Sequence, residues 1–581
     1  MRVTPSVGSN LQMPPPAAAT ITVRATLAML DGPKREIAEG VANDEYVFWL
    51  GSGISRERMP DLRDVAKRVL VTLQARIDQS DPSCRFKQAL EDVVTLANPS
   101  PDEWGRIAFD QPADNWPDYE ALAARLVGNY ARMLDVPVDG EEADYLLWDV
   151  LDAANIYANP TIEPDAEHLC LAALAIEGVA SELPTANWDN LIERAVERLA
   201  GAQPVLRVVV APNEIRWNRL RANLYKFHGC ARAAQIDAAQ FRGLMVARQN
   251  QINGWSARNP VMAPFLTGLI TRRPTLMLGL SAQDSNIQNL FAEAQAAMAW
   301  PWPSHPPAYA FSENALGIDQ RGLLQNVYHL HYGPANRSAM ESEALVQAYA
   351  KPLLLALLLF VVTAKLKRLV EIGSPGLAPA DRDKLHDGLE HARNLVADGL
   401  NPNAAEVGDL IVQCGRTMSM LRGGRLPDAA SGIYAPVTTE PLHRMPADPS
   451  LADSGVCQFA AAAALIGLGI DRGHWTATPA DTTDPASGAL VLTGRSGPAK
   501  VYFAATAQAA IRLGTNGLVA DNDDVVIIHS HETPPAMQRY PRRAPGRVGL
   551  ASVREASMEE LLSAGTEVED LLGRFRSKVA L

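Results

Sequence analysis

The sequence predicts an α/β protein with a Rossmann-like parallel sheet, and three observations support this fold class. Between residues 26 and 347, short apolar runs alternate with helical stretches, which is the pattern of βαβ units. Clusters of polar residues and glycines directly follow several of these runs, as in open parallel sheets that bind ligands at the carboxyl ends of their strands. Abundant Ala and Leu, with only 6% aromatic residues, also favour α/β layers over a β-sandwich.

The predicted strands of this first domain are five apolar runs connected by helices. They span residues 46–50, 179–184, 222–227, 275–280 and 308–311. The long segment between residues 63 and 185 is largely helical, with predicted helices at 118–134 and 142–157. We therefore expect a helical insertion between the first two strands.

Beyond residue 347 the pattern becomes helical and then mixed. We divide the chain into a flexible tail (1–25), the α/β domain (26–347), a helical packing or oligomerisation region (348–430) and a small α/β domain that senses a signal or docks a partner (431–581). The helical region contains predicted helices at 353–371, 379–399 and 404–421, before a linker at 423–450. The last domain contains predicted strands at 489–492, 501–503 and 525–528, with helices at 506–513 and 558–578.

Composition narrows the classes of function. The chain has 581 residues, 47% of them hydrophobic, which excludes a mostly disordered protein and requires more than one domain. Its formal charge of −13 argues against a broad basic surface, so we expect no direct nucleic-acid binding. The five cysteines form no C-x-x-C pair, which excludes a disulfide scaffold and a zinc ribbon.

Targeting segments are also missing from the sequence. The first 25 residues lack the charged-then-apolar pattern of a secretory signal. The most apolar run, residues 352–364, is shorter than the roughly 18 residues that span a bilayer, so a buried helix is the better interpretation. We expect a soluble, cytoplasmic protein that does not bind a membrane.

The first polar cluster is Gly51-Ser52-Gly53-Ile54-Ser55, directly after the first predicted strand. A glycine turn between a strand and a helix exposes backbone N–H groups to a phosphate, and the helix N-terminus adds partial positive charge. An ordinary βα turn also carries glycines, so this cluster alone leaves both interpretations open. The segment Pro60-Asp61-Leu62-Arg63 follows closely and makes the pattern more specific.

The second cluster, Thr185-Ala186-Asn187-Trp188-Asp189, follows the second predicted strand. Its polar side chains lie where parallel sheets bind ligands. The alternative is that Asn187 or Asp189 only caps the helix that continues through residues 191–196. Taken alone, the cluster fits the cap better.

Two further clusters follow the next predicted strands. Phe227-His228-Gly229 places a histidine beside a glycine, which suits a general base near neutral pH, although such a histidine is more often structural. Gly279-Leu280-Ser281-Ala282-Gln283-Asp284 comes at the end of the fourth strand. Each cluster has an ordinary structural explanation, but four of them follow strands in a fixed order.

In this order the clusters resemble the motifs of the sirtuin family, namely G-A-G-x-S, P-D-F-R, T-x-N-x-D, H-G and G-x-S. The resemblance covers roughly residues 40–345, about half the chain. The zinc ribbon of protein-deacetylating sirtuins is missing, because a structural zinc site needs about four ligands and no paired cysteines follow His228. With its helical insertion and Asp284, the chain is more similar to the sirtuin-like effectors of bacterial anti-phage defence, which hydrolyse NAD⁺.

This resemblance implies an NAD⁺ hydrolase that depletes NAD⁺, with no metal in its site. It implies that His228 is the general base and that Asn187 orients water or the ribose hydroxyls. The residues implied to bind NAD⁺ are Gly51, Ser52, Gly53 and Ser55 at the pyrophosphate, Asp61 and Arg63 near the nicotinamide ribose, Thr185 and Asp189 in the pocket, and Gly279, Ser281 and Asp284, the first two toward the adenosine ribose.

A catalytically silent scaffold that binds NAD⁺ or ADP-ribose is the alternative function. The presence of both Asn187 and His228 favours the enzyme, because a binding module needs neither. Since constant NAD⁺ hydrolysis would kill the host, the resemblance also implies control by residues 348–581. The expected partners are a second copy of the chain, in a homo-oligomer, and a HerA-like ATPase or another defence protein.

Three features of the C-terminal part are less specific. Residues 494–500 resemble a phosphate loop superficially, but the G-x-x-x-x-G-K-[ST] spacing is missing. His529-Ser530-His531-Glu532 offers metal ligands at alternate strand positions, although ordinary histidines are the better interpretation. The basic stretch at 539–547 is either a solvated loop or a contact for a partner.

Overall fold

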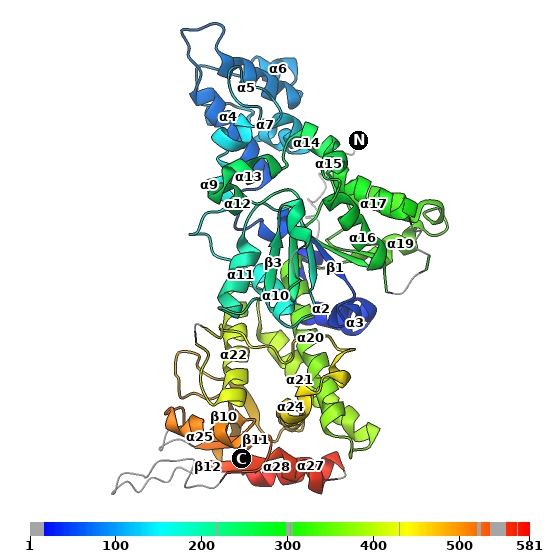
Figure 1. Ribbon diagram of the computed structural model, residues 1–581, viewed down its shortest axis with the longest axis vertical. Helices are drawn as coiled ribbons and strands as arrows, with labels where there is room; N and C mark the ends of the chain where they lie inside the picture. Colours follow the sequence, from blue (N-terminus) through cyan, green and yellow to red (C-terminus); the bar gives the residue numbers. More distant parts are fainter. Residues whose placement is uncertain are drawn as a thin grey trace, which may run out of the picture.

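The computed structural model describes residues 17–216, 219–297, 302–303, 306–428, 430–519, 524–534, 553–565 and 567–581. The molecule is elongated, with the helical insertion at one end, the first sheet in the middle and the C-terminal module at the other end (Figure 1). The basic stretch at 539–547 lies outside the described residues, as do residues 1–16 of the expected tail. The rest of that tail includes α1 (Ala17–Thr20) and the start of α2 (Val23–Asp31).

A sheet of seven parallel strands forms the centre of the molecule and confirms the predicted Rossmann-like fold class. The order across the sheet is β3-β4-β2-β1-β5-β6-β7. Two strands were not predicted, because β3 lies half-buried at the sheet edge and β7 has only two residues, so neither makes an apolar run. The strands are β1 (Val47–Leu50), β2 (Glu182–Thr185), β3 (Leu206–Val209), β4 (Ala222–Lys226), β5 (Thr275–Leu278), β6 (Tyr309–Ser312) and β7 (Leu345–Val346).

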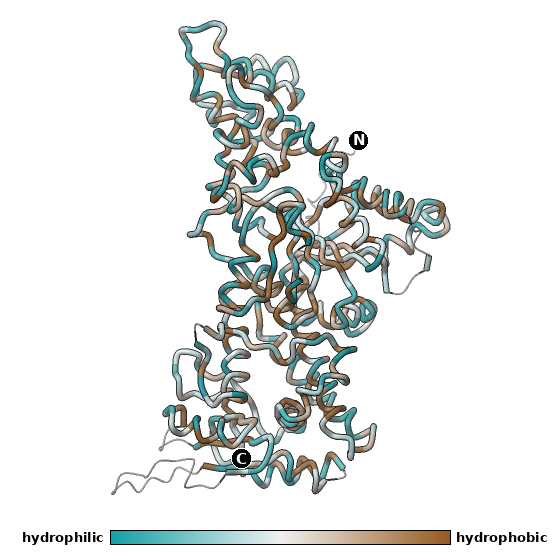
Figure 2. The backbone as a smooth tube through the Cα atoms, in the orientation of Figure 1, coloured by the Kyte–Doolittle hydropathy of each residue, from teal (hydrophilic) through white to brown (hydrophobic). Residues whose placement is uncertain are grey.

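Alternate side chains of β1 enter two different cores. Phe48 and Leu50 pack into the core on one face of the sheet, whereas Val47 and Trp49 pack into the core on the other face. Helices cover both faces of the sheet, so both faces of each central strand are buried and its sequence is a continuous apolar run. Figure 2 shows hydrophobic segments gathered in the middle of the molecule. The first face is covered by α2, α3 (Arg35–Ala42), α10 (Ala166–Ile176), α11 (Leu191–Ala200) and α20 (Ala350–Gly373), and the second by α16 (Met262–Arg272), α17 (Ser285–Ala297) and α18 (Ile318–Tyr328).

Most of the segment between β1 and β2 folds into a helical lobe with a separate hydrophobic core, to which Leu191, Ala231, Ala234, Met245 and Ala247 also contribute. Neither helix predicted there is continuous. A 3₁₀ turn at Val127–Asn129 interrupts the first, and Asp152, with a φ of 56°, interrupts the second. The elements of the lobe include α4 (Leu62–Ala75), α5 (Arg85–Leu96), α7 (Tyr119–Leu126), α8 (Tyr130–Met133), a π-helical turn (Leu146–Val150) and α9 (Ala153–Tyr157).

Helix α20, with 24 residues, joins the two halves of the molecule. Its side chains from Leu353 to Val361 are buried in the core beneath the first sheet, and Leu369 and Val370 belong to the core of the C-terminal module. The apolar run at 352–364 is therefore part of a buried helix, as predicted. No helix in the described part of the chain is both long and apolar enough to cross a membrane.

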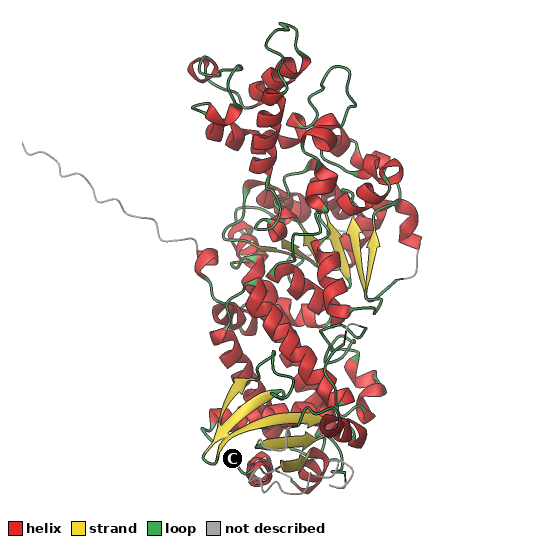
Figure 3. Ribbon diagram, turned by 90° about the vertical axis from the view of Figure 1, so that its left-hand side faces the viewer, coloured by secondary structure: helices red, strands yellow, loops and turns green. Residues whose placement is uncertain are grey.

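The C-terminal module contains a second, mixed sheet that lies apart from the first (Figure 3). Its order is β12-β11-β10-β9-β8, with β10, β11 and β12 parallel and the other two antiparallel. Helices α21 and α22 share one hydrophobic core with this sheet and with α24, whose apolar surface all round gave no amphipathic pattern to predict it. The strands are β8 (Thr476–Pro479), β9 (Leu490–Gly494), β10 (Gly497–Ala504), β11 (Val525–His529) and β12 (Val553–Ser557). The helices are α21 (Pro379–Gly399), α22 (Ala404–Gly423), α24 (Val456–Asp471), α25 (Ala507–Thr515), α27 (Met558–Ala564) and α28 (Val568–Val579).

Two C-terminal features have ordinary structural explanations. Residues 494–500 form the tight hairpin between β9 and β10, in which Gly494 pairs with Gly497. His531 lies 3.2 Å from a carboxylate oxygen of Glu559. No group of three or more His, Cys, Asp or Glu side chains that could hold a metal occurs in the part of the chain that the structure describes.

Candidate active site

The four clusters lie at the carboxyl edge of the first sheet. Strands β2 and β5 flank β1, and β4 lies next to β2. From β1 the chain adds β2, β3 and β4 on one side of the sheet, and then crosses to add β5 on the other side of β1. The order in which strands are added therefore reverses between β1 and β5, although the strands remain parallel. Such a switch point opens a crevice outside the carboxyl ends of the strands, where α/β proteins bind ligands.

The glycines of the first and fourth clusters hold two loops against each other. The Gly51 N–H donates to the Leu278 carbonyl and the Gly53 N–H donates to the Gly279 carbonyl, both at 3.0 Å. A Cβ on Gly53 would lie 2.6 Å from Gly279 Cα, and Gly279 has a φ of +61°. Glycine is therefore required at positions 53 and 279, because the two backbones are in contact. Ser52, between the two glycines of the first cluster, is exposed at the mouth of the crevice.

The helix expected directly after the first cluster is only a short 3₁₀ turn, Ser52–Ser55. The next α-helix, α4, begins at Leu62 and is capped by Asp61, whose carboxylate accepts hydrogen bonds from the backbone of Arg63 and Asp64. Arg63 itself forms an exposed ion pair with Glu120, at 2.6 Å. In this structure Asp61 and Arg63 therefore contact protein groups of the helical lobe.

The second cluster ties β2 to β1 and leaves one acceptor open. The Thr185 hydroxyl donates to the Leu50 carbonyl at 3.1 Å and accepts from the Asn187 N–H at 3.0 Å. The Asn187 amide nitrogen donates to the Gly51 carbonyl at 3.1 Å. Its Oδ1 is buried and has no hydrogen-bond partner among the described residues. Asn187 is thus oriented by protein contacts, with an acceptor oxygen available to a ligand.

Asp189 contributes to a buried network that the sequence did not reveal. The His168 Nδ1 accepts the Asp165 N–H, so its Nε2 carries the proton and donates to the Ser55 hydroxyl at 3.1 Å. That hydroxyl donates to Asp189 Oδ2 at 3.0 Å, and Asp189 Oδ1 accepts the Leu191 N–H. Burial lowers the pKa of His168 to about 4 and keeps it neutral. Neither Asn187 nor Asp189 is the N-cap of α11: that position is Asn190, which makes no side-chain cap hydrogen bond, and Asp189 accepts only the first N–H of the helix.

His228 lies fully within the protein, on the loop after β4. Its Nε2 accepts a hydrogen bond from the Asn286 amide at 2.8 Å, which assigns the ring proton to Nδ1. Burial lowers the pKa of His228, although the Asp284 carboxylate and the Asn286 amide act in the opposite direction. The Asn286 Oδ1 is buried without a partner among the described residues. His228 is therefore a neutral base at pH 7.

The rest of the fourth cluster faces the helical lobe and the solvent. The Tyr130 hydroxyl, from α8, donates to Asp284 Oδ1 at 2.6 Å. Burial, and then the Asp284 charge, raises the pKa of Tyr130 well above its usual value, so the tyrosine keeps its proton. Ser281 is exposed, and its hydroxyl accepts from the Gln283 N–H at 3.4 Å. The insertion thus closes one side of the crevice.

The sequence patterns missed three residues of this site: His168, Asn286 and Tyr130. Asn286 could have been found from the sequence, because it follows the fourth cluster by two residues, at the start of α17. His168 lies in the fully buried helix α10, and Tyr130 lies in a separate lobe, so neither had a signal in the local sequence.

The chain was compared with known protein families and with curated proteins. The family model of the SIR2-like domain matches residues 181–332, which include the second, third and fourth clusters. No curated protein matches the chain. The matched segment runs from β2 to the turn after α18, and the glycine cluster after β1 completes its carboxyl edge. The protein therefore contains a Sir2-type domain, the kind of domain that binds NAD⁺.

Proposed function

We propose that this protein is an NAD⁺ glycohydrolase that cleaves NAD⁺ to ADP-ribose and nicotinamide. One observation carries the proposal: a buried amide oxygen without a described partner, on Asn187, and a buried neutral histidine, His228, stand at the same edge of a Sir2-type sheet. The oxygen suits a ribose hydroxyl or a water molecule as donor, and the histidine suits a proton acceptor.

In the proposed reaction, the bond between ribose C1′ and the nicotinamide nitrogen breaks. Nicotinamide leaves with the bonding electrons, which neutralise its ring, and a water oxygen forms the new bond to C1′. His228 Nε2 takes a proton from that water and passes it to solvent, after the water has replaced the Asn286 amide at this lone pair. A positioned base of this kind contributes about 10²–10⁴ in rate.

Product analysis tests the proposal directly. Purified full-length protein is incubated with NAD⁺, and chromatography should show ADP-ribose and nicotinamide in equal amounts. The His228→Ala variant should release nicotinamide at least about 10²-fold more slowly while it remains folded. Undiminished release by both His228→Ala and Asn187→Ala would refute the assignment. NAD⁺ binding without any product would favour the silent scaffold.

We also propose that this hydrolysis serves anti-phage defence, because the helical insertion, Asp284 and the missing paired cysteines resemble the sirtuin-like defence effectors. Expression in infected cells should lower their NAD⁺ concentration, and the His228→Ala variant should not. The homo-oligomer expected from the resemblance is tested separately by size-exclusion chromatography with light scattering, where a strict monomer at micromolar concentration would count against it.

A further inference from the structure

A second cavity lies on the opposite side of the Sir2-type domain from the candidate active site. It has a volume of about 830 Å³ and opens between the C-terminal half of α22, helix α25 and the segment that follows α22. Gln203, just past the end of α11, closes it from the Sir2-type domain. This volume falls in the range of about 300–1,000 Å³ that is typical of small-molecule sites.

The cavity carries a surplus of positive charge. Arg422, Arg425 and Arg512 line it, and no carboxylate lines it among the described residues, in a chain whose net charge is −13. Arg422 is oriented by hydrogen bonds to the Pro436 and Val437 carbonyls, both at 2.9 Å. Arg512 forms no ion pair with a described residue, whereas Arg425 pairs with Asp428 at 3.0 Å. The Glu177 carboxylate acts on the charge of Arg422 but does not line the cavity.

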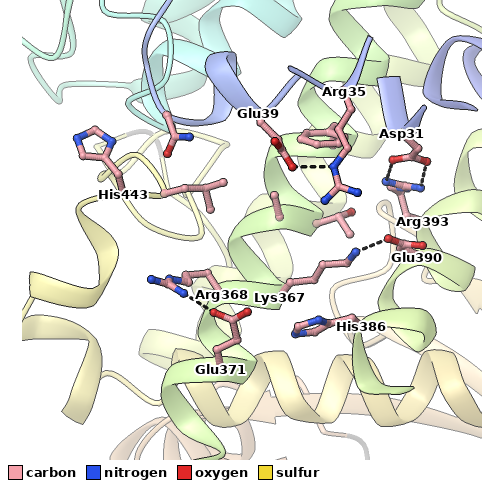
Figure 4. Close-up of a pocket in the computed structure, with 15 residues that line it drawn as sticks. Asp31, Arg35, Glu39, Lys367, Arg368, Glu371, His386, Glu390, Arg393 and His443 are labelled. Atoms are coloured by element: carbon pink, nitrogen blue, oxygen red, sulfur yellow. Dashed lines mark hydrogen bonds and ion pairs between the residues drawn. The ribbon is translucent and has the colours of Figure 1, made fainter. Parts of the chain in front are cut away.

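Another cavity, formed partly by α20 and by α21 of the C-terminal module, has a different balance of charge. It measures about 630 Å³ and lies between α2, α3, α20 and α21. Figure 4 shows that its cations face carboxylates, with Arg393 on Asp31, Lys367 on Glu390, Arg368 on Glu371 and Arg35 on Glu39. Its charges are compensated by the protein, so it holds no surplus charge for a ligand.

Part of the positive charge in the first of these two cavities, which we call the arginine cavity after Arg422, Arg425 and Arg512, has a simple reason. Arg422 and Arg512 stand in the last turns of α22 and α25, where a cation is stabilised by the helix dipole. The dipole accounts for each arginine separately. It does not account for three arginines, with Arg425 beyond the helix, that line one cavity without a carboxylate.

The walls of the arginine cavity are set by close backbone contacts. A Cβ on Gly415 would lie 1.8 Å from the Ile433 carbonyl oxygen, and one on Gly424 would lie 2.0 Å from that of Ala509. A Cβ on Gly432 would lie 2.3 Å from the Leu199 carbonyl oxygen. These contacts lock α22, α25 and the end of α11 together, so the cavity exists before a ligand arrives.

We propose that this cavity binds a small molecule that carries two or more phosphate groups. Guanidinium groups are matched to phosphate because they donate paired hydrogen bonds in a plane and keep their charge. The amides of Gln203, Gln508 and Asn516, on the same walls, supply donors and acceptors for the rest of the molecule. The proposal does not depend on the NAD⁺ chemistry, since the site and its test are separate from the carboxyl edge.

Isothermal titration calorimetry of the full-length protein tests the proposal with two probes, ADP and inorganic tripolyphosphate. Arg512→Gln and Arg425→Gln should each weaken binding of the preferred probe by about tenfold, equivalent to the loss of 1.4 kcal/mol. Arg495→Gln is the matched control, because this exposed arginine lies on the β9–β10 hairpin of the same module and outside the cavity. Tight binding of ADP alone would identify a nucleotide, and equal binding of both probes an inorganic or general polyphosphate site.

Three results would overturn the proposal: no heat with either probe, an equal loss in Arg495→Gln, or binding that is insensitive to both cavity variants. The last result is also expected if ADP binds only at the Sir2-type carboxyl edge. Melting curves identify a variant that fails to fold, and Gln508→Ala then provides a second variant on the same wall.

Discussion

Two buried polar clusters of this protein differ in how many of their atoms have partners. Below the first sheet, Lys365 of α20 and Glu177 at the end of α10 form an ion pair of 2.7 Å with no exposed side-chain surface. Lys365 also donates to the Glu177 and Thr438 carbonyls, and Glu177 accepts from the Tyr434 hydroxyl and the Val437 N–H. We call this the junction cluster, because it connects α10, α20 and the linker.

The cluster at the carboxyl edge is buried to a similar degree but is incompletely paired. Asn187 Oδ1 and Asn286 Oδ1 have no partner among the described residues, and His228 Nε2 accepts a hydrogen bond from the neutral Asn286 amide. A buried polar atom without a partner is unfavourable by about 1–3 kcal/mol. The junction cluster avoids that penalty and serves stability, whereas the edge cluster retains it, as expected of a site that a ligand completes.

The largest expected effect is on the junction cluster. Lys365→Ala should lower the free energy of unfolding by about 3–5 kcal/mol, because it leaves the Glu177 carboxylate buried without its ion-pair partner. Urea denaturation followed by circular dichroism measures the loss. The double variant Lys365→Met with Glu177→Gln should recover part of it, and a single variant as stable as the wild type would show that this cluster is not structural.

Asn187→Ala should have the reverse profile, a large effect on activity and a small one on stability. Losing a preorganised hydrogen bond to the reacting groups lowers kcat by about 10²–10³-fold. Among the described residues, the side-chain amide of Asn187 forms one hydrogen bond, to the Gly51 carbonyl. The free energy of unfolding should therefore fall by about 1 kcal/mol.

Asn223→Ala is the matched control for Asn187→Ala. Asn223 is also buried and has an Oδ1 without a partner among the described residues, but it lies at the amino end of β4, on the opposite edge of the sheet. Nicotinamide release should not change in this variant. A comparable loss of activity in Asn223→Ala would show that position at the carboxyl edge is not what makes Asn187 important.

Acidification should destabilise the edge cluster through His168. Its pKa is about 4 in the folded protein, below the ordinary value of 6.5, so the unfolded chain takes up a proton first as pH falls. Stability from this group is present above pH 6.5 and is lost as the pH falls to about 4, by about 3 kcal/mol in total. Melting temperatures across this range, compared with those of His168→Gln, isolate the contribution. An identical pH dependence in the variant would contradict it.

The smallest effect is expected at the helix cap. Asp61→Ala should lower the free energy of unfolding by about 1 kcal/mol, and Asp61→Asn should retain most of it because asparagine also caps helices. The KM for NAD⁺ distinguishes the role of Asp61 as a helix cap from the contact with NAD⁺ that the sirtuin resemblance implies for it. An unchanged KM for NAD⁺ in Asp61→Asn supports the cap, and a raised KM would return Asp61 to the site.

The elements that could be predicted are those with a local pattern. Helix α21 begins and ends where its periodicity predicts, at Pro379 and Gly399, and the strands at the sheet centre follow continuous apolar runs. Helix α24 could not be predicted, because a helix that is buried all round has no polar stripe. The break at Gly565 between α27 and α28 was missed for the opposite reason, since the amphipathic period continues across it.

The sequence by itself determined five of the seven strands of the first sheet, the loops that carry the four clusters, and therefore the edge at which a ligand would bind. Only the tertiary structure decided which side chains meet there. Ser55 meets His168 and Asp189 across 113 and 134 residues, and His228 meets Asn286 across 58. The reason is physical: hydrophobic periodicity is local, whereas the order of strands in a sheet, which makes distant loops neighbours, results from packing of the whole domain.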